Sequence, residues 1–158
     1  MFKSPGQCRL KVILVYGLPM IRIPRFRQCA ALPFQDKASL RRVLLITSLG
    51  TRRWILPKGN IEPGLTVRES TEFEAFEEAG VMGTLHSDSI GSYTYEKFND
   101  DEDILHHVKV FPLEVEKVLD EYPHHTKRER QWMEPVDAIE AVDEPELKDL
   151  IAKFAAQT

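Results

Sequence analysis

The amino-acid sequence predicts an α/β protein with helices on both faces of a mixed β-sheet. Strand-like runs lie on both sides of one central helical segment, and further helical segments close the chain. The strand-like runs are 27–35, 41–48, 54–57, 89–98 and 104–115, with an expected hairpin loop at 98–103. The C-terminal helices, 134–142 and 144–157, each have a proline near the first turn, where proline favours helix initiation. This element order is typical of an α/β/α sandwich.

Length and composition indicate one domain. The chain has 158 residues, of which 42% are hydrophobic and 29% are charged, as in ordinary globular proteins. We expect residues 25–158 to form that domain and residues 1–24 to be an N-terminal extension of uncertain order. The apolar run 12–20 is too short to cross a bilayer. It is interpreted as a strand or an added segment, with a signal peptide as a third alternative.

The charge distribution bears on the partners. A net charge of −4 argues against nucleic-acid binding, although basic residues are concentrated in the first third, which could face an anion. Cys8 and Cys29 do not form a disulfide framework, so a reducing cytoplasm is predicted. No membrane partner is expected, and both a monomer and a homodimer remain open.

A helix is predicted immediately before Gly80. Thr66 and Glu69 have the spacing of a capping box, in which each side chain accepts a backbone N–H of the other residue. Glycine is the residue type that most readily adopts the left-handed conformation after a helix end. The predicted helix therefore runs from Val67 to Ala79.

Three acids crowd this predicted helix. At 100° per residue, Glu74, Glu77 and Glu78 fall within one narrow sector, so they repel by about 0.2 to 0.5 kcal/mol per pair. The apolar side chains expected to point inward from the other side are Ala75, Phe76 and Ala79. A divalent cation such as Mg²⁺ or Mn²⁺ would reverse the repulsion, because hard cations bind carboxylate oxygens and substrate phosphates together. The alternative is a solvated acidic helix face.

Residues 54–81 resemble the Nudix box, whose pattern is G-x5-E-x7-R-E-U-x-E-E-x-G-U, with U aliphatic. The first glycine matches Gly59, and the final glycine and aliphatic residue match Gly80 and Val81. The resemblance implies that Glu74, Glu77 and Glu78 are catalytic metal ligands for Mg²⁺ or Mn²⁺. It also implies a Nudix-type α/β/α sandwich. Over residues 25–151 the chain is similar to the subgroup that hydrolyses diphosphoinositol polyphosphates and dinucleoside polyphosphates.

The resemblance also implies a set of substrate-binding residues. They are Arg27, Arg52, Arg53, Lys58, Gly59, Arg128 and Arg130, to which Lys127 belongs by position. Arg128 and Arg130 are expected on one face of an alternating strand, and arginine can grip phosphate with two parallel hydrogen bonds. The candidates for the general base are Glu74, which we favour, and Glu114, Glu116 and Glu121.

Two box positions depart from the family pattern. Leu65 stands where the family has glutamate, and Phe73 stands where it has arginine. Because apolar replacement of an ion pair is often neutral in stability, we predict a packing contact between Leu65 and Phe73. The change also leaves Glu74 without the arginine that helps to orient it.

The sequence therefore predicts a metal-dependent hydrolase that cleaves phosphoanhydride bonds by in-line water attack on a small polyphosphate substrate. Dinucleoside polyphosphates and diphosphoinositol polyphosphates are the expected substrate classes. The first alternative is a catalytically impaired Nudix-fold module that binds a nucleotide or regulates. The second is sanitation of oxidised nucleoside triphosphates, which explains the basic clusters less well.

Overall fold

The computed structural model describes residues 14–15, 18–19, 27–98 and 103–157. Its strands are β1 (Leu14–Val15), β2 (Leu18–Pro19), β3 (Gln28–Lys37), β4 (Leu40–Thr47), β5 (Trp54–Ile55), β6 (Lys58–Asn60), β7 (Val81–Leu85), β8 (Gly91–Phe98), β9 (Asp103–Val118) and β10 (Arg130–Met133). Its helices are α1 (Val67–Glu74), the π-helix η1 (Ala75–Ala79), α2 (Pro135–Ala141) and α3 (Pro145–Ala155).

The main sheet is mixed, as the sequence predicts. Its strand order is β10-β4-β3-β9-β7, and β5, β6 and β8 add to β4, β3 and β9 respectively. The central strands β3 and β9 run parallel, with Gln28 opposite Val108 and Phe34 opposite Glu114. The other described pairings in this sheet are antiparallel. Strand β3 is buried along most of its length because both of its faces are covered.

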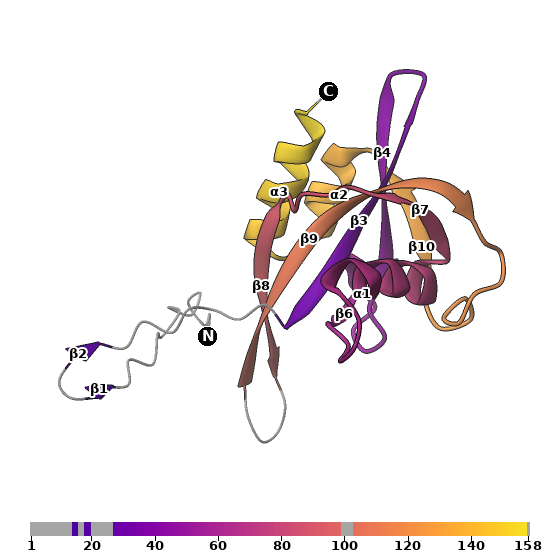
Figure 1. Cartoon of the computed structure of the whole chain (residues 1–158). Coiled ribbons are helices and arrows are strands. Elements are labelled where there is room, and N and C mark those ends of the chain that lie inside the picture. Colours follow the sequence, from indigo (N-terminus) through magenta and orange to yellow (C-terminus); the bar gives the residue numbers. More distant parts are fainter. Residues whose placement is uncertain (1–13, 16–17, 20–26, 99–102, 158) are drawn as a thin grey trace.

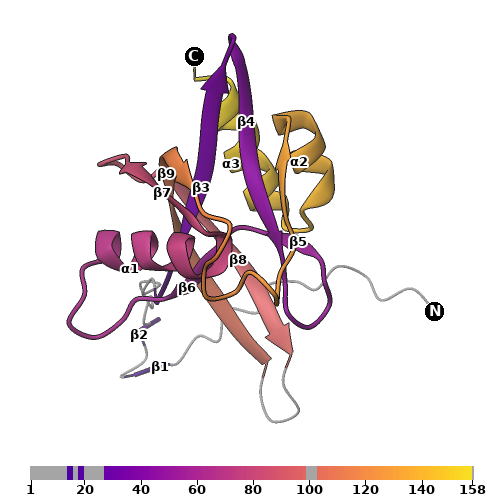
Figure 2. The same cartoon turned by 90° about the vertical axis from the view of Figure 1, so that its right-hand side faces the viewer.

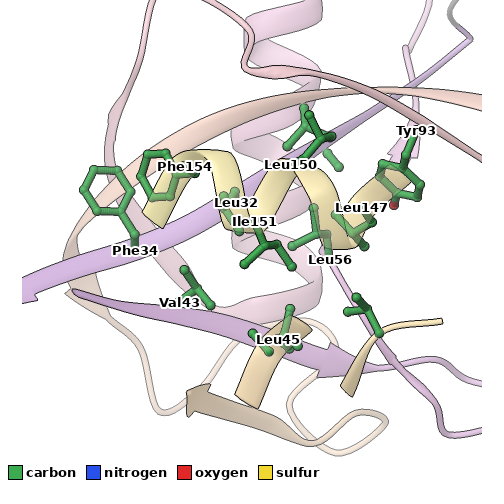
Figure 3. Close-up of a cluster of buried hydrophobic side chains, with 14 of the residues drawn as sticks. Leu32, Phe34, Val43, Leu45, Leu56, Tyr93, Leu147, Leu150, Ile151 and Phe154 are labelled. Atoms are coloured by element: carbon green, nitrogen blue, oxygen red, sulfur yellow. The ribbon is translucent and has the colours of Figure 1, made fainter. Parts of the chain in front are cut away.

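Helices cover both faces of the sheet, which confirms the predicted α/β/α sandwich. Helices α2 and α3 lie on one side, and α1 lies on the other (Figures 1 and 2). On the α3 face, Leu147, Ile151 and Phe154 pack against sheet residues that include Leu32 and Val43 (Figure 3). On the α1 face, a second cluster of apolar side chains holds Ala75 and Ala79 of η1. The functional helix is therefore fixed to the sheet by small residues.

The predicted elements largely appear at the expected positions. The run 54–57 contributes only β5, because its last two residues precede β6 rather than continue the strand. Strand β7 had no prediction, since its five residues alternate weakly and hold Gly83. In the apolar run 12–20, β1 pairs with β2 through Val15 and Leu18. The rest of the extension and loop residues 99–102 lie outside the described residues.

None of the helices described by the structure is long and apolar enough to cross a membrane.

Candidate active site

The acidic helix has the start and end that the sequence predicts. The Thr66 hydroxyl accepts the backbone N–H of Glu69, and the Glu69 carboxylate accepts the backbone N–H of Thr66, at 3.1 and 2.7 Å. At the other end Gly80 adopts the left-handed conformation with φ 63°. The last turn, however, is a π-helix. A π-turn takes one extra residue, so it re-aims the side chains that follow and occurs frequently at functional sites.

The two faces of this helix differ from the prediction. Glu74 and Glu78 are only 8% and 7% exposed, whereas Phe73 is 45% exposed and Phe76 is half-buried. The expectation that the inward side of the helix lies opposite the acids is therefore wrong for Glu74 and Glu78, which are more buried than Phe76. Ala75 and Ala79 are fully buried as expected. For Glu78 the physical reason is that Lys58 and Arg128 supply hydrogen-bond donors, which compensate in part for the burial of its carboxylate.

Glu78 is held by two donors from different parts of the chain. Its Oε1 accepts a hydrogen bond of 2.6 Å from Nη2 of Arg128. Its Oε2 accepts the backbone N–H of Lys58 at 3.0 Å. Burial still raises the pKa of the Glu78 carboxyl above its usual value, although these donors oppose the shift. The Glu78 carboxylate thus lies at the start of β6.

Glu74 packs directly against the backbone of Gly59. A Cβ at position 59 would overlap the Glu74 carboxylate, so this close approach requires glycine. Burial, followed by repulsion from Glu78, Glu77 and Glu62, raises the pKa of Glu74 to about 7. Glu62 is thus a fourth acid near the site that the box pattern did not include.

Glu77 is directed to a different partner from the other two acids. Its Oε1 lies 3.8 Å from Nε2 of His124, and its backbone carbonyl accepts the His124 N–H at 3.0 Å. Within the described part of the chain, no three histidine, cysteine or acidic side chains lie together as a ready-made metal cluster. The structure therefore brings Glu74 and Glu78 together and places Glu77 toward the loop between β9 and β10.

Lys58 joins the site to a polar chain across the sheet. Its ammonium lies 4.3 Å from the centre of the Tyr95 ring and donates to the Tyr95 hydroxyl at 3.2 Å. That hydroxyl donates to Oε1 of Gln28 at 2.7 Å, and the ring stacks on His106 with centroids 4.8 Å apart. Burial lowers the pKa of the Lys58 amine, an effect that Glu78 opposes. This half-buried cation has only partial compensation from the nearby acids.

Three further predicted substrate residues have described partners other than the three helix carboxylates. Arg53 pairs with the buried Glu144 at 2.5 Å. The exposed Arg52 donates to the Lys127 carbonyl at 3.2 Å and lies 3.4 Å from the Glu129 carboxylate. Arg27 is exposed, and its carbonyl accepts the backbone N–H of Ile61. Only Arg53 is drawn into a buried interaction.

Arg128 and Arg130 both contact the end of the acidic helix, but by different means. Arg128 pairs with Glu78, whereas Arg130 donates to the backbone carbonyls of Ala79 and Leu119 at 2.8 and 2.6 Å. Strand β10 begins at Arg130, so Arg128 precedes it, and the prediction that both lie on one strand is wrong. The guanidinium of Arg130 thus satisfies the Ala79 carbonyl, one of those that a helix end leaves without partners.

The predicted packing of Leu65 against Phe73 is not a buried contact. They are 42% and 45% exposed, and neither belongs to a buried apolar cluster. Leu65, which precedes α1, and Phe73 on α1 are therefore exposed apolar side chains where the family pattern has a charged pair.

The candidate general bases are also distinguished by position. Glu114, Glu116 and Glu121 are exposed, and Glu116 accepts a hydrogen bond from Thr84 on β7 at 2.6 Å. Glu74 is buried beside Glu78. No sequence pattern singled out His124, Thr47 or Tyr95, because strand pairing and a long loop bring them to the site from distant positions. The only local signal for Tyr95 was its position two residues after Tyr93, which places both side chains on the same face of the strand.

Glu74 and Glu78 fit a divalent cation on chemical grounds. Mg²⁺ commonly uses one or two protein carboxylates and completes its coordination with water and substrate phosphates. Burial without enough counter-charge raises the proton affinity of both carboxylates, and a bound cation would supply that charge. The two acids therefore have the donor chemistry that Mg²⁺ or Mn²⁺ requires.

Comparisons with known proteins agree with this geometry. The NUDIX domain family model matches residues 25–154, so the chain belongs to the NUDIX domain family, as the box resemblance predicts. Nudix hydrolase 16, mitochondrial, from Arabidopsis thaliana is 35% identical over 122 residues, which are 75% of this chain and 67% of the relative. Diphosphoinositol polyphosphate phosphohydrolase 3-beta from Bos taurus is 30% identical over 118 residues, which are 73% and 68% of the two chains. These matches bear out the predicted pyrophosphohydrolase type of enzyme.

The fold has close counterparts among solved structures. A C. elegans Ap4A hydrolase in a binary complex superimposes with a TM-score of 0.60 over 84% of this chain and 96% of that chain. Its sequence identity is 23%, so the likeness shows the fold alone. The chain spans about half the length of three further Arabidopsis relatives, Nudix hydrolases 12, 13 and 21.

Proposed function

We propose that this protein is a metal-dependent hydrolase that cleaves a phosphoanhydride bond in a small, highly phosphorylated molecule. The observation that carries the proposal is the buried pair Glu74 and Glu78, beside the cationic side chains of Lys58 and Arg128. Carboxylates that bind a cation, next to basic groups that bind phosphate oxygens, are the arrangement that phosphoryl chemistry requires. Relatives named as Nudix hydrolases and diphosphoinositol polyphosphate phosphohydrolases support the same class.

Each residue has a distinct role in this mechanism. Glu74 and Glu78 would hold the cation, which supplies charge neutralisation on the phosphate and lowers the pKa of water. Arg128 and Lys58 are proposed to bind phosphate oxygens and so orient the phosphorus for in-line attack. Glu77 would contribute indirectly, because its backbone and side chain both face His124. Arg53 and Arg52 would hold more distant phosphates, and Gly59 leaves room for the Glu74 carboxylate.

Glu74 is the proposed general base. Its pKa of about 7 suits proton abstraction near neutral pH. This role requires that the cation lies closer to Glu78 than to Glu74, because a cation bound directly to the Glu74 carboxylate would lower that pKa and weaken the base. The exposed acids Glu114, Glu116 and Glu121 are alternatives whose variants test the assignment: loss of turnover in one of them alone would replace Glu74.

The test is phosphate or nucleotide release from diadenosine pentaphosphate with Mg²⁺ or Mn²⁺, comparing wild type with Glu78→Gln. We expect metal-dependent turnover that falls by about 100-fold or more in the variant, because the charged ligand is lost. Glu72→Gln is the matched control, since Glu72 is an exposed acid on the same helix. Equal turnover in wild type and Glu78→Gln would contradict the proposal.

A binding or regulatory module is the second candidate. The exposed Leu65 and Phe73 favour it, because the charged brace of the family pattern is replaced without a buried substitute. This function predicts that Mn²⁺ and a polyphosphate bind but are not turned over. Calorimetric binding together with the release assay separates it from the hydrolase.

The substrate class is a finer proposal. Dinucleoside polyphosphates and diphosphoinositol polyphosphates fit the basic residues around the site, whereas a nucleoside triphosphate uses fewer of them. Product analysis with a diadenosine compound, an inositol pyrophosphate and an oxidised nucleoside triphosphate ranks the three classes by kcat/KM. The cytoplasm remains the proposed location, although the plant relative is named as mitochondrial, and a fluorescent fusion of the full chain tests it.

A further inference from the structure

We propose that His124 is a positioning residue that sets the Arg128 guanidinium against Glu78 and so prepares it to bind a substrate phosphate. This inference rests on the proposed function for the role of Arg128. It goes beyond the Nudix box, because His124 lies in the loop between β9 and β10, far from the box in sequence. The acidic helix and this loop meet through two side-chain pairs, His124 with Glu77 and Arg128 with Glu78.

The Arg128 guanidinium is held along three directions. Its Nε donates to Nδ1 of His124 at 3.0 Å, its Nη1 donates to the Thr47 carbonyl at 3.1 Å, and its Nη2 donates to Glu78 at 2.6 Å. The Arg128 side chain is 7% exposed. A planar guanidinium fixed by partners in three directions cannot rotate about its long axis. Removing the Nε partner would leave a buried donor unsatisfied and free that rotation.

The His124 ring is itself placed by the acidic helix. Because the Nε of arginine always carries a proton, Nδ1 of His124 must accept, and the ring proton lies on Nε2. That Nε2 faces the Glu77 carboxylate at 3.8 Å, which favours the same tautomer. The His124 backbone N–H donates to the Glu77 carbonyl, and its own carbonyl accepts the backbone N–H groups of Lys127 and Arg128. His124 therefore connects the end of η1 to Arg128 through both backbone and ring.

The contacts of His124 predict different effects on cation binding and on phosphate binding, whereas a general loss of structure would weaken both. His124 touches neither Glu74 nor the Glu78 carboxylate in the described contacts, and Glu78 keeps the backbone N–H of Lys58 as a donor, so cation binding should survive its removal. Phosphate binding should not survive unchanged, because it depends on the orientation of Arg128. The expected signature is weaker polyphosphate binding with unchanged Mn²⁺ affinity.

The experiment compares wild type, His124→Ala and His124→Asn, with His125→Ala as the control. His125 is the adjacent, exposed histidine, whose Nδ1 contacts the Tyr122 carbonyl rather than Arg128. The readouts are Kd for Mn²⁺ and for β,γ-methylene ATP, KM and kcat for diadenosine pentaphosphate, and the thermal midpoint. For His124→Ala we expect about a 10-fold rise in KM and in the Kd of the ATP analogue. Asparagine should restore most of this, because its side-chain oxygen can accept at the Nδ1 position.

A double variant tests whether His124 acts on phosphate binding through Arg128. In Arg128→Lys, which lacks the Nε–H donor, His124→Ala should cause no further loss of analogue binding. An additional loss there, or a failure of asparagine to rescue, would overturn the proposal. A weaker Mn²⁺ affinity with a lower thermal midpoint in His124→Ala would also overturn it, since that pattern indicates a structural role. Because the analogue Kd needs no turnover, an inactive protein would refute the proposed function while this inference is still tested.

Discussion

The two faces of the sheet are built from different chemistry. The face under α2 and α3 is an apolar core that contains Leu32, Leu147 and Ile151, each at most 1% exposed. The face under α1 also buries carboxylates, because Glu74 and Glu78 point into it. Both faces belong to the same central strands, β3 and β9.

This difference shows how the fold separates stability from function. Apolar burial contributes about 25 cal/mol per Å² and needs no specific partner. A buried carboxylate costs free energy until a donor or a cation compensates for it. The stability of the α1 face therefore depends on pH and on a bound cation. The apolar contacts of the α3 face depend on neither.

The largest expected effect is on the apolar face. Ile151→Ala removes a fully buried side chain and leaves a cavity, so it should lower the free energy of unfolding by about 2 to 5 kcal/mol. Chemical denaturation measures this loss. The KM of the folded fraction should remain unchanged, and a selective loss of Mn²⁺ binding would break the distinction between the two faces.

The next effect is a pH dependence of the acidic face. In EDTA, burial and neighbouring acids raise the pKa of Glu74 from 4.5 to about 7. The folded state therefore binds more protons than the unfolded state, so stability is greatest below pH 4.5 and falls as the pH rises to about 7. The shift corresponds to at most about 3 kcal/mol.

Glu74→Gln is the matched test, because it removes this titration and should flatten the stability curve between pH 4.5 and 7. Denaturant midpoints across that range, with and without Mn²⁺, provide the measurement. Saturating Mn²⁺ should stabilise wild type increasingly as the pH rises and leave the variant nearly unaffected. A wild-type curve in EDTA that rises with pH through this window would contradict the assignment.

A smaller effect is expected at the start of α1. Thr66→Ala removes the hydroxyl that caps the Glu69 N–H and should cost about 1 kcal/mol. Thermal unfolding checks this value against Ser87→Ala, which changes an exposed loop hydroxyl. A loss of metal binding in Thr66→Ala would show that the cap at the start of α1 also fixes the position of Glu74 at its end.

The smallest effect concerns the outer surface of the same helix. Leu65→Glu together with Phe73→Arg restores the family's charged pair at two exposed positions. Exposed ion pairs contribute about 0.2 to 1 kcal/mol, so a double-mutant cycle should give a small, salt-sensitive coupling. An increase in kcat with this pair would show that the missing arginine had left Glu74 poorly oriented, whereas zero coupling would show that the two positions do not meet.

Local patterns in the sequence predicted local structure well. The Thr66–Glu69 capping box and Gly80 defined the helix bounds, because caps depend on residues within a few positions. The Nudix box resemblance also identified the family. The periodicity argument failed at the last turn, since a 100° step assumes an α-helix and η1 is a π-helix.

The sequence by itself determined the order of the longer elements, the bounds of the acidic helix and the chemical nature of its acids, since these follow from short-range spacing and residue type. Only the tertiary structure decided which acids face inward, that Glu77 meets His124, and that Arg128 lies between Thr47 and Glu78. The reason is that partners for buried charges come from distant segments, which strand pairing brings together. Periodicity describes one helix, whereas burial of a carboxylate depends on the donors that the rest of the fold supplies.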